Sequence, residues 1–243
     1  MATDSTSTAV EIFELPGDAV YPESVSVDPA SGDAYVGSLA DGALYRLASD
    51  REVVRWSPAG QDGRSSVAGI KVDRKGRLWA AGGYDGTLYV YELTSRSLLA
   101  RLDVGARPSC VNDIAFGPGG KAYVTDSFIS LLFRAAGDPL VLEPWVDLAE
   151  QGVPWSDGLN LNGIVLTLTN DTLWPVRRTS AASGGSRSRA ARSRRSRCGA
   201  ARSSTVTGWR CRIRRCTSRS TPAIGSRSST SPTTAPAAAS ERW

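Results

Sequence analysis

The sequence predicts an all-β protein of the β-propeller class, and three observations lead to that prediction. A pattern of 44 residues occurs three times in register, it begins a fourth time, and each copy holds four short strand-like stretches separated by turns. Four antiparallel strands in roughly 40–50 residues are typical of one propeller blade. A β-sandwich also has frequent turns, but it does not require the same residue at the same phase of each copy. We therefore favour the propeller.

Matching residues recur at three equivalent positions of each copy. They are the turn glycines Gly32, Gly76 and Gly120, the second-strand aromatics Tyr35, Trp79 and Tyr123, and the third-strand leucines Leu44, Leu88 and Leu132. Asp-Gly joins the second and third strands in the first two copies, at Asp41-Gly42 and Asp85-Gly86. Because glycine accepts the positive φ of a tight turn, this dipeptide predicts a hairpin. The third copy has Ile129-Ser130 there, which is a weaker turn signal.

Further strands are expected at the two sides of each blade. An outer strand is predicted in each copy, at residues 52–57, 97–104 and 139–148. Residues 9–15 alternate between apolar and polar side chains, which predicts a strand that would close the ring against the last blade. Residues 1–8 are small and polar and are expected to be a flexible terminus.

The fourth copy is incomplete. It starts at Asn162, turns at Asn170-Asp171 and enters a second strand that contains Pro175. Because proline lacks the N–H that a strand ladder uses, we expect the repeat to break at this residue. Residues 9–175 are therefore predicted to form a partial propeller of about three and a half blades.

Charge divides the chain into two parts of different composition. Residues 1–175 contain 13 basic and 23 acidic residues, a net charge of −10, whereas residues 176–243 contain 16 arginines and one acid, a net charge of +15. The basic part has no apolar periodicity, so we expect it to be a disordered tail. Two interpretations stay open. It is either a basic arm that binds polyanions such as nucleic acid, or a segment translated in a shifted reading frame, which would leave the propeller truncated.

Several classes of function are excluded or made less plausible by composition. There is no histidine, so a Ser-His-Asp triad and histidine metal sites are excluded. The four cysteines form no CxxC pair. No apolar run reaches the ~18–20 residues that a membrane span needs, and the first residues lack the features of a signal peptide. We expect a cytoplasmic protein without a membrane partner.

The repeat predicts which side chains reach the mouth of the central channel. The innermost strand of each blade lines that channel, and the start of this strand falls at Glu23, Val67-Ala68, Asn112 and Asn162. Carboxylate and amide oxygens from three blades would converge on one point, where they suit a hard divalent cation such as Ca²⁺. The alternative is structural, because Asn-Asp and Asn-Gly pairs often cap turns and Glu23 could be an ordinary loop acid.

Three segments resemble the blade starts of the regucalcin/gluconolactonase family, six-bladed propellers of the senescence-marker-protein type. They are YPESVSVDPASGDAYVGS, VNDIAFGPGGKAYVTDS and NGIVLTLTNDTLW, and the resemblance covers residues 9–175. It implies a divalent metal, Ca²⁺ or alternatively Zn²⁺, held by Glu23 and Asn162. It also implies that Asn112 completes the metal site or contacts substrate, and that Arg107 contacts a small lactone or a sugar-acid-like substrate.

One family residue has no match. The family takes a metal ligand and general base from an aspartate of a later blade, and residues 176–243 contain no aspartate. We therefore expect a metal-dependent lactonase-like hydrolase of doubtful activity. Two alternatives stay open, a non-catalytic propeller that binds a small molecule or a metal, and a scaffold whose basic arm binds nucleic acid. The sequence leaves the oligomeric state open.

Overall fold

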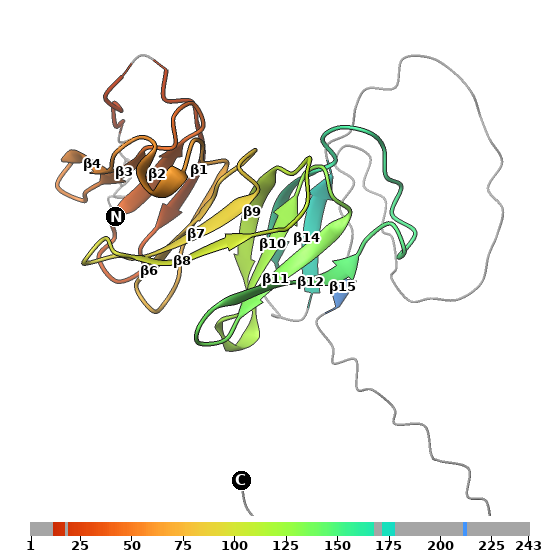
Figure 1. The fold of residues 1–243 in the computed structure, drawn as a ribbon. Coiled ribbons are helices and arrows are strands. Elements are labelled where there is room, and N and C mark those ends of the chain that lie inside the picture. The colour runs from red at the N-terminus through yellow and green to blue at the C-terminus, as the bar shows by residue number, and fades with distance from the viewer. Residues whose placement is uncertain (1–11, 18, 168–171, 178–210, 213–243) are drawn as a thin grey trace, which may run out of the picture. The chain divides into compact units, whose positions relative to one another are not determined.

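The fold is all-β, as predicted. The computed structural model describes residues 12–17, 19–167, 172–177 and 211–212, and these form four antiparallel sheets that follow one another along the chain (Figure 1). Three sheets hold four strands each in chain order and the last holds three. One repeat therefore makes one sheet, which is the arrangement of a partial propeller.

The strands lie where the repeat places them. The first sheet consists of β1 (Pro22–Val27), β2 (Ala34–Ser38), β3 (Leu44–Leu47) and β4 (Val53–Ser57). The second consists of β5 (Gly69–Val72), β6 (Arg77–Ala81), β7 (Thr87–Glu92) and β8 (Leu98–Asp103). The third consists of β9 (Val111–Phe116), β10 (Ala122–Asp126), β11 (Leu131–Ala136) and β12 (Val141–Asp147), and the last of β13 (Leu161–Leu166), β14 (Thr172–Arg177) and β15 (Cys211–Arg212). Two short 3-10 turns lie in loops, η1 (Gln61–Gly63) and η2 (Pro118–Gly120).

The register confirms the period of 44 residues. Tyr35 pairs with Arg46, and the pairs Trp79–Val90 and Tyr123–Arg134 stand at the same positions of the next two sheets. The predicted turn glycines Gly32, Gly76 and Gly120 have φ values of 79°, 69° and 72°. A side chain would be strained in that conformation, so glycine is required at the first turn of each repeat.

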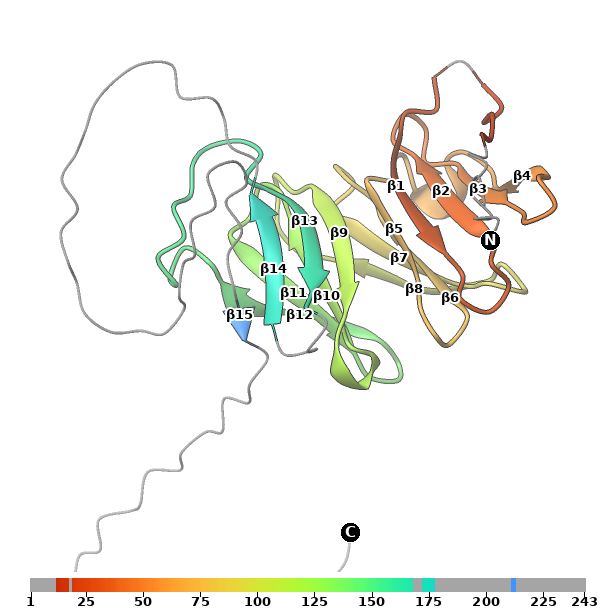
Figure 2. The same cartoon turned by 180° about the vertical axis from the view of Figure 1, so that it is seen from behind.

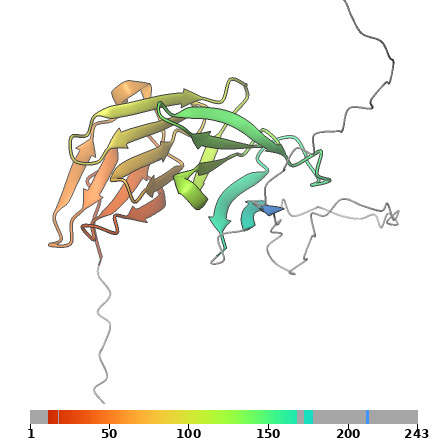
Figure 3. The same ribbon diagram turned by 90° about the horizontal axis from the view of Figure 1, so that it is seen from below.

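The innermost strands β1, β5, β9 and β13 contact one another in chain order, as Figure 2 shows from behind. In Figure 3 the same sheets are seen from below, with their colour changing from one repeat to the next. Two serines fasten β1 to β5, because Ser24 Oγ accepts from Ile70 N at 3.2 Å and Ser26 Oγ accepts from Val72 N at 2.9 Å. The starts of the inner strands are thereby brought together at one end of the sheets.

The apolar cores lie between neighbouring sheets. Tyr35 belongs to the core between the first and second sheets, Trp79 to the next and Tyr123 to the one after it. Trp56 is buried in the first of these cores. Trp145 and Trp155 pack against the third core.

A buried cation links the first two sheets. Arg64 is fully buried, its Nε donates to Gly42 O at 2.6 Å, and its two terminal nitrogens donate to Tyr91 Oη and Ser57 Oγ. Burial lowers the pKa of Arg64, and the adjacent Tyr91 acts in the opposite direction. Because a buried charge is tolerated only when its donors are satisfied, this network fixes the β4–β5 loop between the sheets.

One predicted strand is absent. Of residues 9–15, the structure describes Ile12–Leu15, and these residues do not form a strand. Leu15 instead packs beside Val20, Ala43 and Tyr45. A strand forms only by pairing with another strand, and none of the four described sheets pairs with this segment.

Pro175 does not end its strand, contrary to the prediction. β14 runs through Pro175 to Arg177, two residues past the predicted boundary, and Pro175 pairs with Ile164. Thr172 O accepts from Thr167 N at 2.9 Å, so Thr172 and every second residue after it direct their backbone groups toward β13. Pro175 is one of the alternate residues, whose backbone groups face away from β13. Its missing N–H therefore removes no hydrogen bond between β14 and β13.

The outer side of β14 has little pairing within the described residues. β15 pairs there only with Thr172 and Leu173, at Arg212 and Cys211. The flexible terminus predicted for residues 1–8, and most of the basic tail predicted for residues 176–243, lie outside the described residues. Within the part of the chain that is described, no helix is long and apolar enough to cross a lipid bilayer.

Candidate functional site

A small cavity lies at the starts of the inner strands, where the repeat predicts the channel mouth. Its volume is about 110 Å³, and it is lined by residues of four sheets: Glu23, Ser24, Ala68, Asn112, Asp113, Asn162 and Gly163. The three predicted oxygen donors, Glu23, Asn112 and Asn162, thus line the same space. The second repeat contributes Ala68, so no oxygen-bearing side chain comes from that blade.

The three donors are not committed to other contacts in the described part of the chain. Glu23 and Asn162 are exposed and Asn112 is half-buried. Among the described residues, none of these side chains has a hydrogen bond or an ion pair. Turn-capping asparagines would bond to nearby backbone groups, so the geometry speaks against a purely structural role for the two amides.

Asp113 also lines the cavity, although the repeat does not predict it as a site residue. Its Oδ1 accepts from Ile114 N at 2.8 Å and lies 3.5 Å from Lys71 Nζ, and its Oδ2 accepts from Ile164 N at 3.0 Å. The carboxylate therefore ties β9 to β5 and β13. In the sequence, only the position of Asp113 directly after Asn112 indicated that it lies near the site. The packing of the sheets is needed to show that Lys71 pairs with its carboxylate and that Ile164 N donates to it.

Glycine is required where β5 passes β9. A Cβ on Gly69 would stand 2.2 Å from Asn112 O and 3.0 Å from Asp113 Cα. No real side chain tolerates so short a contact with a backbone. Gly69 therefore allows the two strands to approach, and this approach sets the position of Asn112 at the cavity.

Arg107, the predicted substrate-contacting residue, does not line this cavity. Its guanidinium is exposed and donates to both carboxylate oxygens of Asp103, at 3.2 and 2.8 Å, and to Asp85 O at 2.8 Å. The hydrogen bond to Asp103 raises the pKa of Arg107, and the same bond lowers the pKa of Asp103. The side chain lies over Gly86, where a Cβ would come within 2.6 Å of its Cζ.

Cys110, which precedes β9, is not a plausible nucleophile. Cys110 is free and buried. Burial raises the pKa of its thiol to about 11, and the negative charges of Asp126 and Glu23 act in the same direction. Because the thiolate is the reactive form, this thiol stays inert near neutral pH.

The donor set fits a hard cation incompletely. One carboxylate and two amide oxygens are ligands that Ca²⁺ accepts, and water would complete its six to eight ligands. Within the described residues, no group of three His, Cys, Asp or Glu side chains could hold a metal ion. A carboxylate-rich site is thus not found there, and one carboxylate and two amides of the predicted set line an open cavity instead.

The comparisons with known proteins identify a fold. No family model matches the chain, and no curated protein matches it. Solved structures do match. Virginiamycin B lyase from Staphylococcus aureus is 15% identical with a TM-score of 0.54 over 67% of this chain and 50% of that one. A streptogramin B lyase is 13% identical with a TM-score of 0.55 over 67% and 50%. Hydrazine synthase from Kuenenia stuttgartiensis is 13% identical with a TM-score of 0.54 over 72% and 47%.

These identities are too low to carry an activity from one protein to another. The chain spans about half the length of the solved chains that it matches. The matches agree with the succession of four-stranded sheets and with the cores between them. The chain is therefore part of a β-propeller, and the chemistry of its site has to be argued from its own residues.

Proposed function

We propose that the chain is a propeller of the metal-dependent, lactonase-like hydrolase kind, in which Glu23, Asn112 and Asn162 hold a divalent cation, Ca²⁺ first among the candidates. The observation that carries this proposal is that the three side chains come from three different repeats, line one cavity and have no other partner among the described residues. Such a cation would polarise the carbonyl of a small lactone or sugar-acid-like ligand. Glu23 would supply the formal negative charge, and the amide oxygens of Asn112 and Asn162 would orient the cation in the cavity.

A second candidate is a propeller that binds such a ligand without turning it over. One observation favours it. Hydrolysis needs a general base, and the other carboxylate at the cavity, Asp113, is engaged by Lys71 and by two backbone N–H groups. Its oxygens are therefore already occupied, which leaves Glu23 as the only free carboxylate among the residues that line the cavity. We expect cation binding to be easier to detect than turnover.

Cation binding can be measured on the full chain by calorimetry with Ca²⁺. Glu23→Gln keeps the size of the side chain and removes its charge, so we expect affinity to fall at least tenfold. Glu52→Gln is the matched control, because Glu52 is an exposed glutamate outside the cavity. Equal affinities of the two variants would contradict the cation site, since the acidic propeller part would then attract Ca²⁺ without a defined position.

The enzymatic part of the proposal needs a separate assay. Hydrolysis of a small aldonolactone is followed with and without Ca²⁺, in the wild type and in Glu23→Gln. Turnover that depends on Ca²⁺ and is lost in the variant supports a hydrolase. Binding of Ca²⁺ without any turnover supports the binding module instead. Because two of the solved propellers are named as lyases, product analysis should distinguish hydrolysis from elimination.

A further inference from the structure

We propose that the opposite ends of the inner strands carry a second binding site, for a small organic anion with an apolar body. A cavity of about 610 Å³ lies there. It is lined by the last residues of β1, β5 and β9 and by the turns that follow: Val27, Pro29, Val72, Asp73, Arg74, Lys75, Arg77, Phe116 and residues 117–120. The volume falls in the range of roughly 300–1,000 Å³ that is usual for small-molecule sites.

The cavity carries an excess of positive charge. Three of its lining residues are basic and only Asp73 is acidic. The carboxylate of Asp73 is saturated, because it accepts from Lys75 N at 2.8 Å, from Arg77 N at 3.0 Å, from Arg77 Nε at 2.7 Å and from Trp79 Nε1 at 2.9 Å. Its charge is thus compensated within the turn, mainly by Arg77.

Two of the three basic side chains that line the cavity have no acidic partner among the described residues. Arg74 and Lys75 are exposed, and neither side chain has an ion pair within the part of the chain that the structure describes. The remainder of residues 1–175 is strongly acidic, which would repel anions in general. A pair of uncompensated cations at a cavity is therefore a local exception, and an arginine beside a lysine is suited to a phosphate or carboxylate group.

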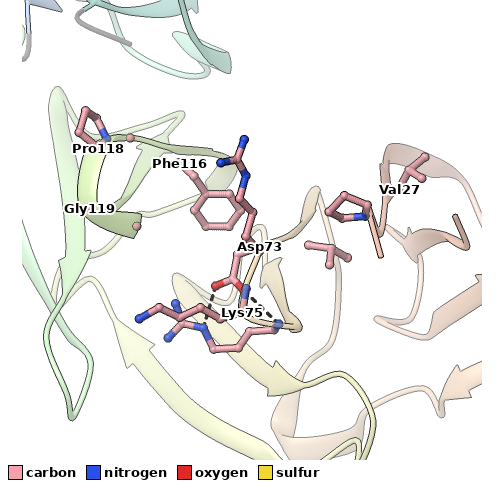
Figure 4. A pocket seen from close by; sticks show the side chains of 12 residues that line it. Val27, Asp73, Lys75, Phe116, Pro118 and Gly119 are labelled. Carbon is pink, nitrogen blue, oxygen red and sulfur yellow. Dashed lines mark hydrogen bonds and ion pairs between the residues drawn. The ribbon is translucent and has the colours of Figure 1, made fainter. Parts of the chain in front are cut away.

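The charge belongs to one repeat only. Arg74 and Lys75 correspond to Ala30 and Ser31 in the first repeat and to Pro118 and Gly119 in the third. None of these four residues is charged, so cations stand at these two positions in the second repeat alone. In Figure 4 Phe116, Pro118 and Gly119 come from one side and Val27 from the other, with Asp73 and Lys75 between them.

The walls of the cavity are apolar. Phe116 meets Trp79 edge to face, with ring centroids 5.6 Å apart, so its ring is held in place from behind. Val72 is buried, while Val27 is 56% exposed and leaves its methyl groups open to an incoming molecule. Inorganic phosphate would use only the cations. A ligand that joins an anionic group to a ring or short chain would use the walls as well, and this chemistry fits the site best.

The site can be tested with phenyl phosphate as the probe, on the full chain, by calorimetry and by hydrogen exchange read by mass spectrometry. We expect phenyl phosphate to bind more tightly than inorganic phosphate or benzyl alcohol, and to slow exchange in residues 27–29, 72–77 and 116–120 together. The double variant Arg74→Ser/Lys75→Ser should bind at least tenfold more weakly. Val27→Trp keeps both cations but fills part of the cavity, so it should also weaken binding of phenyl phosphate.

The basic tail requires a matched control, because its arginines attract phosphates without specificity. Arg51→Ser/Arg55→Ser removes two exposed positive charges outside the cavity and keeps the tail. This variant should bind phenyl phosphate like the wild type. The proposal is overturned if slowed exchange is confined to residues 176–243, if both double variants lose affinity equally, or if Val27→Trp leaves binding unchanged.

Discussion

Gly69 is the single residue on which the position of the candidate site depends most. A Cβ at this position would stand 2.2 Å from the carbonyl oxygen of Asn112. That oxygen belongs to the backbone of β9, so a side chain cannot simply turn away and the two inner strands would have to separate. The separation would move Asn112 relative to Glu23 and Asn162, although Gly69 itself does not line the cavity.

Gly69→Ala is therefore expected to lower the free energy of unfolding by about 1–3 kcal/mol, the usual cost of overpacking. It should also weaken Ca²⁺ binding at least as much as Glu23→Gln does. Thermal unfolding and calorimetry measure the two effects. Gly163→Ala is the control for stability, because a Cβ there would meet Asp113 Oδ2 at an ordinary 3.6 Å. If both variants behave alike, close approach at Gly69 does not set the site.

At the scale of elements, the β1–β2 hairpin depends on an ionised aspartate. Asp28 is buried, and its carboxylate accepts from Ala30 N at 3.0 Å, from Ser31 N at 3.2 Å and from Ser31 Oγ at 2.8 Å. Burial by itself would raise the pKa of Asp28, but these hydrogen bonds to the charged form lower it below its ordinary value. The turn is therefore more stable when Asp28 is ionised.

The sign of the pH dependence follows from that shift. Because the pKa of Asp28 is lower in the folded state, its stabilisation is present above the unfolded pKa of about 4 and is lost as the pH falls through the folded value. Asp28→Asn should be less stable than the wild type at pH 7, by roughly 1 kcal/mol, and the difference should shrink below about pH 4. Denaturant unfolding at several pH values measures this.

Asp50→Asn, at an exposed turn of the same sheet, is the control for that experiment and should change stability less than Asp28→Asn at pH 7. A difference between Asp28→Asn and the wild type that stays constant from pH 7 to pH 3 would contradict an ionised Asp28 as its source. The volume or shape of the side chain would then explain the loss instead.

At the scale of the whole molecule, the first and last described sheets each present an apolar side chain to solvent on an inner strand. In β1, Ser24 and Ser26 point toward β5, so the alternation of a strand turns Val25 to the other side, where it is 58% exposed. In β13, Ile164 is buried against the third sheet and Val165 is 56% exposed. A closed propeller covers such faces with neighbouring blades.

We therefore expect the chain to self-associate through these faces. Val25→Thr/Val165→Thr keeps the shape and β-propensity of both side chains and should lower association, measured by sedimentation and light scattering, with little change in unfolding temperature. Val141→Thr is the control, because Val141 is equally exposed, at 58%, but lies on the outer strand β12. A chain that stays monomeric at high concentration, or a control that acts equally, would refute this expectation.

Local chemistry was sufficient to predict most of the fold. Each first turn needs a glycine with positive φ, and each blade needs an aromatic residue between sheets, so Gly32, Gly76 and Gly120 and Tyr35, Trp79 and Tyr123 mark the same period in the sequence and in the structure. The failures are equally physical. Residues 12–15 have a strand pattern but pair with none of the described sheets, and Leu15 packs beside Val20 and Tyr45 instead. Pro175 is tolerated because its nitrogen lies on the side away from β13.

The sequence by itself determined the blades, their strands and which three oxygen donors share one phase of the repeat, because period and turn chemistry are local properties. Only the tertiary structure decided what surrounds those donors. It set Asp113 between Lys71 and the N–H of Ile164, held Arg107 on Asp103 away from the cavity, and gathered Arg74 and Lys75 beside apolar walls at the other end of the strands. Apart from the local pair of Arg107 and Asp103, these contacts join residues of different sheets. Their distances are set by how the sheets pack, which no spacing along the chain specifies.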